Sequence, residues 1–106
     1  MKQLSINVKE LIGENAILIA DGEAIYSRIQ TPLTQGETVE LDFDGVKVFA
    51  PPFFNASIGR LLDGELTIEA LNAQLKFEHL SAFGASILRR VIENAKRYYA
   101  TSGPGV

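Results

Sequence analysis

The sequence predicts an α/β fold with a sheet of about four strands and helices packed mainly on one of its faces. Three segments, near residues 4–8, 39–43 and 75–77, alternate apolar and polar residues with the period of two typical of a half-buried strand. Apolar residues at helical spacing recur between and after them. Sheets covered by helices on both faces use nearly continuous apolar strands, so these half-polar strands indicate one face exposed to solvent.

Each predicted strand has a buried and an exposed set of side chains. The apolar sets are Leu4, Ile6 and Val8, then Val39, Leu41 and Phe43, then Leu75 and Phe77. A fourth candidate is the wholly apolar run AILIA at 16–20, which could be a strand or a buried helical turn. Periodicity does not distinguish the two over so short a run.

The first long helix is expected to follow Asp21-Gly22, which offers a cap. Ile25, Ile29 and Leu33 recur there at helical spacing, and Pro32 is expected to end or kink the helix near Thr31.

Three further helices are predicted. In FFNASIGRLLDG the residues Phe54, Ile58, Leu61 and Leu62 form one apolar stripe, with Gly64 as the stop. TIEALNAQ is short and helical in composition, and SAFGASILRRVIENAKRYYA is capped by Ser81 or Ser86. We therefore expect a single domain over 1–101, followed by a flexible C-terminal tail over 102–106.

Composition excludes several classes of function. A chain of 106 residues with 46% hydrophobic and 22% charged residues is an ordinary globular domain. Ten Lys and Arg are scattered among thirteen Asp and Glu, so no basic stripe predicts nucleic-acid binding. The chain has no cysteine, no signal-peptide pattern and no apolar run long enough for a membrane span. The cytoplasm is the expected compartment.

No set of residues matches a catalytic, metal or cofactor site. The single histidine, His79, has no cysteine or second histidine at ligand spacing, and a structural or surface role is expected for it. Neither GxxxxGK[ST] nor GxGxxG occurs. Asp42 and Asp44 lie two apart at a strand end, so they could bind a ligand or act as paired carboxylates, or simply meet solvent and cap a turn. We expect no metal and no cofactor.

The most distinctive segment is LDFDGVKVFAPPFFNASIGRLL, residues 41–62. It resembles the signature of the STAS-like domains of unknown function, bacterial and phage-associated modules related to the anti-sigma factor antagonists. The matching positions are Leu41-Asp42-Phe43, Gly45-Val46, Phe53-Phe54-Asn55, Ile58-Gly59 and Leu61-Leu62. The resemblance implies a STAS-like, about four-stranded mixed sheet with helices on one side.

In anti-sigma factor antagonists, a partner kinase phosphorylates a serine in the first turn of the helix after the corresponding strand, and the added charge disrupts binding. The matching position here is Pro52, preceded by Pro51, so that hydroxyl is missing. Two prolines predict a stiff helix start with Ala50 extended. Ser57, one turn on, is either a substitute phosphosite or a packing serine.

On a helical wheel Phe53, Ala56, Ser57 and Arg60 share a face separate from the apolar stripe. With Pro51 and Pro52 they form the predicted partner-binding surface; alternatively, Phe53 packs under the Val46-Lys47 loop. The resemblance implies a non-enzymatic regulatory interaction module, whose partner is a histidine-kinase-type ATPase or an anti-sigma-like protein. The alternative function is a small-ligand or nucleotide sensor using Asp42 and Asp44. Oligomeric state does not follow from the sequence.

Overall fold

A computed structural model describes residues 3–63 and 66–101. The central sheet contains β1 (Gln3–Asn7), β3 (Thr38–Asp42) and β5 (Leu75–Glu78) in the order β1-β3-β5. A second, smaller sheet pairs β2 (Asn15–Ala16) with β4 (Val48–Phe49). All three strand pairings are parallel. The expectation of about four strands in one mixed sheet is therefore wrong in strand arrangement and in direction, although the α/β class is confirmed.

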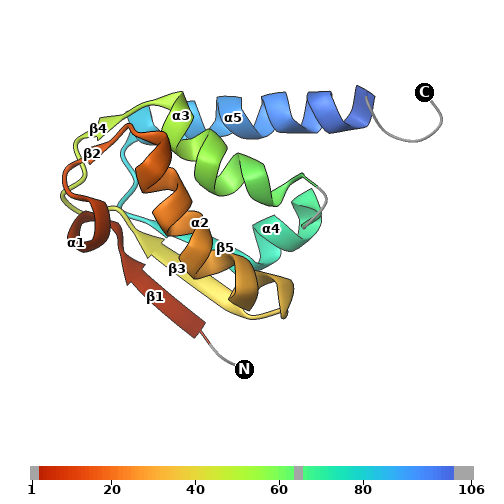
Figure 1. Cartoon of the computed structure of the whole chain (residues 1–106), viewed down its shortest axis with the longest axis horizontal. Helices are drawn as coiled ribbons and strands as arrows, with labels where there is room; N and C mark the ends of the chain where they lie inside the picture. Colours follow the sequence, from red (N-terminus) through yellow and green to blue (C-terminus); the bar gives the residue numbers. More distant parts are fainter. Residues whose placement is uncertain (1–2, 64–65, 102–106) are drawn as a thin grey trace.

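Helices form the crossovers that parallel strands require. Between β1 and β3 lie α1 (Val8–Ile12) and α2 (Ile19–Thr34). Between β4 and β5 lie α3 (Pro51–Phe54), which continues into a π-helical turn η1 (Asn55–Gly59), and then α4 (Ile68–Gln74). The last helix, α5, spans Ala82–Thr101. In Figure 1, α2, α3 and α5 all lie on one side of the three-stranded sheet.

Alternating burial confirms that one sheet face is open to solvent. Ile6, Val39, Leu41 and Leu75 are buried, whereas Ser5 and Lys76 on the other face are exposed. The three alternating segments thus contain strands, as predicted, but their ends differ: Val8 already begins α1 and Phe43 lies just beyond β3. The expected burial of Leu4 is wrong, because on the edge strand β1 its side chain is 37% exposed. The open face needs no second layer of helices because its side chains are polar.

The apolar run at 16–20 is divided between two elements. Ala16 ends β2, and Ile19 already begins α2, with Leu18 as its extended N-cap residue. The cap expected at Asp21-Gly22 is therefore wrong, since both residues lie inside the helix.

Pro32 does not end α2, which continues to Thr34. The stop is at Gly36, whose φ of 83° is a left-handed conformation open to glycine. Glu37 N–H donates to the Pro32 carbonyl at 2.9 Å, and Gly36 N–H donates to the Leu33 carbonyl at 3.1 Å. These two bonds form a Schellman motif, which closes the helix.

Aromatic side chains join the sheet to α3. The Phe43 ring, just beyond β3, lies 5.9 Å from the Phe49 centroid, 6.1 Å from that of Phe54 and 6.3 Å from that of Phe77. Phe43 and Phe54 are no more than 1% exposed. The predicted stripe of Phe54, Ile58, Leu61 and Leu62 is buried in the same core. The core thus fixes the position of α3 and η1 relative to the strands.

The later elements follow the predictions closely. The short helix is α4, and Ser81 caps α5 by accepting the Gly84 N–H at 3.1 Å. Ser86 instead donates its hydroxyl to the Phe83 carbonyl inside the helix. The predicted stop at Gly64 and the tail at 102–106 lie outside the described residues.

Candidate functional site

The two prolines occupy the first two positions of α3, where a missing N–H breaks no helical hydrogen bond. Ala50 precedes them with φ −143° and ψ 150°, so its predicted extended geometry is confirmed. Both proline side chains are exposed. The helix start at this junction is consequently preset and accessible, and it carries no hydroxyl group.

Two of the predicted surface residues lie inside the protein. Phe53 is 1% exposed and Ser57 is fully buried. The Ser57 hydroxyl donates to the Phe53 carbonyl at 2.9 Å, as expected of a packing serine. Neither side chain is available to a partner or a kinase in this fold. The accessible remainder of the predicted surface is Pro51, Pro52, Ala56 and Arg60, with Ala56 half-buried.

The burial of Phe53 and Ser57 has a structural cause in α2, which packs along α3 and η1. A Cβ added at Gly22 would collide with the Phe53 carbonyl oxygen and lie 2.8 Å from the Ala56 Cβ. Glycine therefore lets the two backbones approach closely at this point. The face assigned to a partner is partly occupied by this neighbouring helix.

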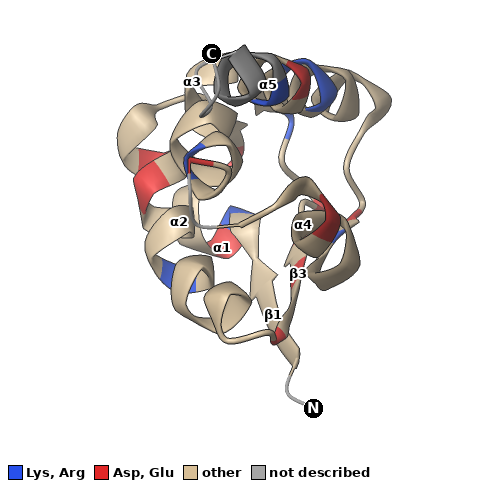
Figure 2. Cartoon of the chain, turned by 90° about the vertical axis from the view of Figure 1, so that its right-hand side faces the viewer, with Lys and Arg blue, Asp and Glu red and all other residues tan. Residues whose placement is uncertain are grey.

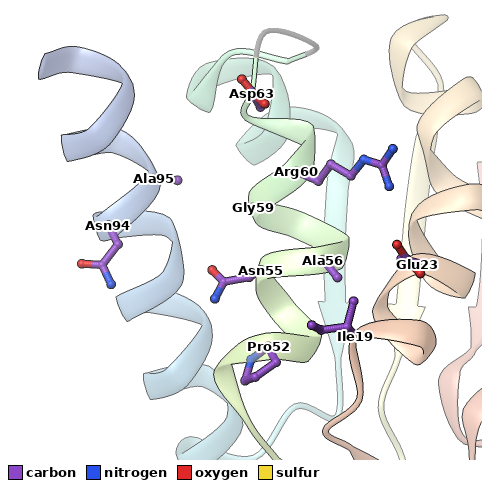
Figure 3. A pocket seen from close by; sticks show the side chains of 10 residues that line it. All are labelled: Ile19, Glu23, Pro52, Asn55, Ala56, Gly59, Arg60, Asp63, Asn94 and Ala95. Atoms are coloured by element: carbon purple, nitrogen blue, oxygen red, sulfur yellow. The ribbon is translucent and has the colours of Figure 1, made fainter. Parts of the chain in front are cut away.

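A groove of about 750 Å³ opens beside the accessible residues, between the start of α2, the helix of α3 and η1, and α5 (Figure 3). The lining residues are Ile19, Glu23, Pro52, Asn55, Ala56, Gly59, Arg60, Asp63, Asn94 and Ala95. Thus three of the predicted partner-binding residues, Pro52, Ala56 and Arg60, line one concavity. Of the other seven, Asn55, Gly59 and Asp63 lie in the same segment, between or just after the predicted residues, but were not assigned to the surface. The remaining four come from α2 and α5, which are distant in sequence.

The π-helical turn lies along this groove. Asn55, Ala56 and Gly59 of η1 all line it. Such turns contain i→i+5 hydrogen bonds, are rare, and occur frequently at functional sites.

Apolar and charged groups both reach the groove. Ile19 is 59% exposed at the start of α2, so its apolar side chain is accessible from the groove. The Arg60 guanidinium carbon lies 4.3 Å from the Tyr26 ring centroid, a cation–π contact that holds the arginine against α2. Glu23 and Asp63 add acidic groups to the lining. The site combines an apolar wall with an arginine held at its edge.

The predicted ligand residues Asp42 and Asp44 lie elsewhere, at the carboxyl end of β3. Asp42 Oδ1 accepts the Asp44 N–H at 3.0 Å and lies 2.8 Å from His79 Nδ1. The Asp44 hydrogen bond, followed by that of His79, lowers the pKa of the Asp42 carboxyl. The same hydrogen bond and the negative charge of Asp42 raise the pKa of His79. Asp42 therefore closes a turn and binds a histidine that sequence reasoning left unpartnered.

His79 adopts a left-handed φ of 57°, unlike every other described non-glycine residue. Its register explains the contact, because Asp42 pairs with Glu78 across β3 and β5 and the next residue can reach the carboxylate. In the described part of the chain, no group of three or more His, Cys, Asp or Glu side chains is arranged to hold a metal ion.

Charge and hydropathy add two observations. Lys and Arg are interspersed with Asp and Glu over the helices (Figure 2), without a continuous basic face in that view. Among the described helices, none combines the length and the apolar composition needed to cross a membrane.

Parallel strands, helices on one side of the three-stranded sheet and an exposed helix start directly after β4 define a small α/β domain of the STAS-like class. Residues 21–85, 65 of the 106, match the STAS-like domain of unknown function, and the chain belongs to that family. This match confirms the family resemblance drawn from residues 41–62. No curated protein and no solved structure matches the chain.

Proposed function

We propose that this protein is a non-enzymatic regulatory module that binds a protein partner in the groove between α2, η1 and α5. The observation that carries the proposal is the convergence of Pro52, Ala56 and Arg60 with the exposed Ile19 on one concave surface beside a π turn. Exposed apolar side chains next to an anchored arginine are typical of interface centres. The partner class is a histidine-kinase-type ATPase or an anti-sigma-like protein.

The likeness to anti-sigma factor antagonists supports this partner class and suggests how regulation differs here. Pro52 stands at the position of the phosphorylated serine, and Ser57 is buried with its hydroxyl bound to a backbone carbonyl. Phosphorylation at the helix start is therefore not the means by which binding is controlled. Binding is expected to depend on the abundance of the partner or on the partner's own state.

The test is calorimetric titration of purified ATPases and anti-sigma-like proteins from the same genome against the wild-type chain. Asn55→Arg places a bulky charge in the groove, and Arg60→Ala removes the anchored arginine. Each is expected to weaken binding by about tenfold or more, the loss typical of an interface anchor. Arg90→Ala, an exposed arginine of α5 outside the groove lining, is the matched control.

Circular dichroism must show that each variant is folded. Equal affinity of wild type, Asn55→Arg and Arg60→Ala for a bound partner would contradict the proposed surface. Failure of every candidate of both classes to bind would contradict the partner class.

The alternative, a nucleotide or small-ligand sensor at Asp42 and Asp44, has no specific structural observation in its favour. The Asp42 carboxylate is already engaged by Asp44 and His79. Thermal-shift measurements with nucleotides test it directly, because a ligand that binds only the folded state raises the melting temperature with concentration. We expect no shift at millimolar nucleotide, and a saturable shift abolished by Asp42→Asn would favour the sensor.

A further inference from the structure

The strand β1 forms an unprotected edge of the central sheet (Figure 1). Its five residues pair with β3 on one side, and within residues 3–63 and 66–101 no strand lies on its other side. An open edge presents backbone N–H and C=O groups that can pair with a further strand. The opposite edge, β5, carries the exposed charges of Lys76 and Glu78, which discourage such pairing. By contrast, Gln3–Asn7 contains neither a charge nor a proline.

A groove of about 360 Å³ runs beside this edge. It is lined by Leu4, Ser5, Ile6, Asn7, Glu10, Leu11 and Arg28. Leu4 is 37% exposed and Leu11 is partly buried against the core, so the groove has an apolar strip next to the strand. Glu10 and Arg28 have opposite charges, and neither forms an ion pair with another described residue.

We propose that the β1 edge binds a second copy of this chain, with the two β1 strands antiparallel about a two-fold axis. Full overlap of the five residues places Ser5 opposite Ser5 of the second copy and Gln3 opposite Asn7. The antiparallel arrangement sets the carboxyl end of each strand against the amino end of the other. Two three-stranded sheets would thereby become one continuous sheet.

The charges beside the strand fit this symmetry. Glu10 lies in α1, directly after the carboxyl end of β1. Arg28 lies just past the middle of α2 and lines the same groove as Glu10. Antiparallel pairing of the two β1 strands turns the groove of each copy toward that of the other. Glu10 and Arg28 of one copy are then expected to approach Arg28 and Glu10 of the second. A patch that complements itself in this way is the requirement for a two-fold interface.

The expected association is weak. Five strand residues span about 17 Å, well below the extent of an obligate dimer interface. Leu4 and Leu11 from both copies add apolar contact, but the interface stays small. We therefore expect a dissociation constant of about 10 μM to 1 mM. The dimer is therefore a concentration-dependent state, and the partner groove between α2, η1 and α5 is a separate surface.

The first test uses the absence of cysteine from the chain. Ser5→Cys introduces a single thiol at the two-fold axis, where directly opposed side chains have Cβ atoms about 4.5–5.5 Å apart. A disulfide needs about 3.5–4.5 Å, so the bond forms with only a small shift of the two strands. We expect the Ser5→Cys variant to form a covalent dimer under mild oxidation at least about tenfold faster than Lys76→Cys, an exposed control on the opposite sheet edge. Equal rates for the two variants would overturn the proposed register.

The second test is a charge exchange measured by sedimentation at high protein concentration. Glu10→Arg and Arg28→Glu are each expected to weaken self-association by about tenfold, and the double variant to restore it to within about threefold of wild type. A wild-type chain that stays monomeric at about 1 mM would refute the dimer. A double variant as weak as the single ones would refute the pairing of Glu10 with Arg28.

Discussion

The close packing of α2 on the π turn can be tested with one glycine. Gly22→Ala introduces a Cβ that collides with the Phe53 carbonyl oxygen and approaches the Ala56 Cβ to 2.8 Å. Neither neighbour is the flexible end of a long side chain, so the helices must separate. Overpacking of this kind lowers the free energy of unfolding by about 2–3 kcal/mol. The better helix propensity of alanine offsets about 1 kcal/mol of this loss. We expect a net loss of about 1–2 kcal/mol in the free energy of unfolding.

Gly59→Ala is the matched control, since it also lies in a helix beside the groove. Its added Cβ would meet the Val91 side chain at 3.5 Å, an ordinary van der Waals distance. Stability is expected to stay equal or to rise by up to about 1 kcal/mol. Urea unfolding measures both variants, and each kcal/mol corresponds to about 4 °C in melting temperature for a domain of this size. A Gly22→Ala protein as stable as wild type would refute the close approach of the two helices.

Three further predictions follow from individual contacts. Ser57→Ala removes one buried hydrogen bond and should lower the free energy of unfolding by about 1 kcal/mol. Ser57→Asp buries an unpaired charge and should lower it by more than about 3 kcal/mol. Urea unfolding measures both, and similar losses for the two variants would show that water reaches this side chain. The stability advantage of wild type over His79→Gln should be greatest between the ordinary pKa of Asp42 and the ordinary pKa of His79. It should fall as pH rises toward and through the raised pKa of His79, and as pH falls toward and through the lowered pKa of Asp42. A difference in stability that does not change with pH would contradict the ion pair. Arg60→Ala removes the cation–π contact with Tyr26 and should lower the free energy of unfolding by about 0.5–1 kcal/mol. An unchanged stability in thermal unfolding would show that this contact is not formed in solution.

Elements with a clear period were predictable from the sequence. The strands β1, β3 and β5 alternate apolar and polar residues, and the stripe on α3 and η1 recurs at helical spacing, so both were found. The ladder of β2 with β4 was missed, because two residues per strand carry no period. The start of α2 was misplaced because Leu18, which makes no side-chain cap, gives no sequence signal.

The candidate site was only partly predictable. Pro52, Ala56 and Arg60 were identified because they lie in one short segment, whereas Glu23 and Asn94 reach the groove from other helices. A helical wheel shows which residues share a face, but not which neighbouring helix covers that face. For this reason Phe53 and Ser57 were placed on the partner-binding surface, with burial only as the alternative. The Asp42–His79 pair likewise depends on the register of two strands 37 residues apart in sequence.

Mapping the partner-binding surface by NMR chemical-shift perturbation tests most directly whether a partner binds in the groove. Backbone amide signals of the isotope-labelled chain are followed while a partner that binds by calorimetry is added unlabelled. We expect the largest shifts on the groove residues Ala56, Gly59, Arg60 and Ala95. Shifts concentrated instead around Asp42, Asp44 and His79, with the groove signals unchanged, would contradict binding in the groove.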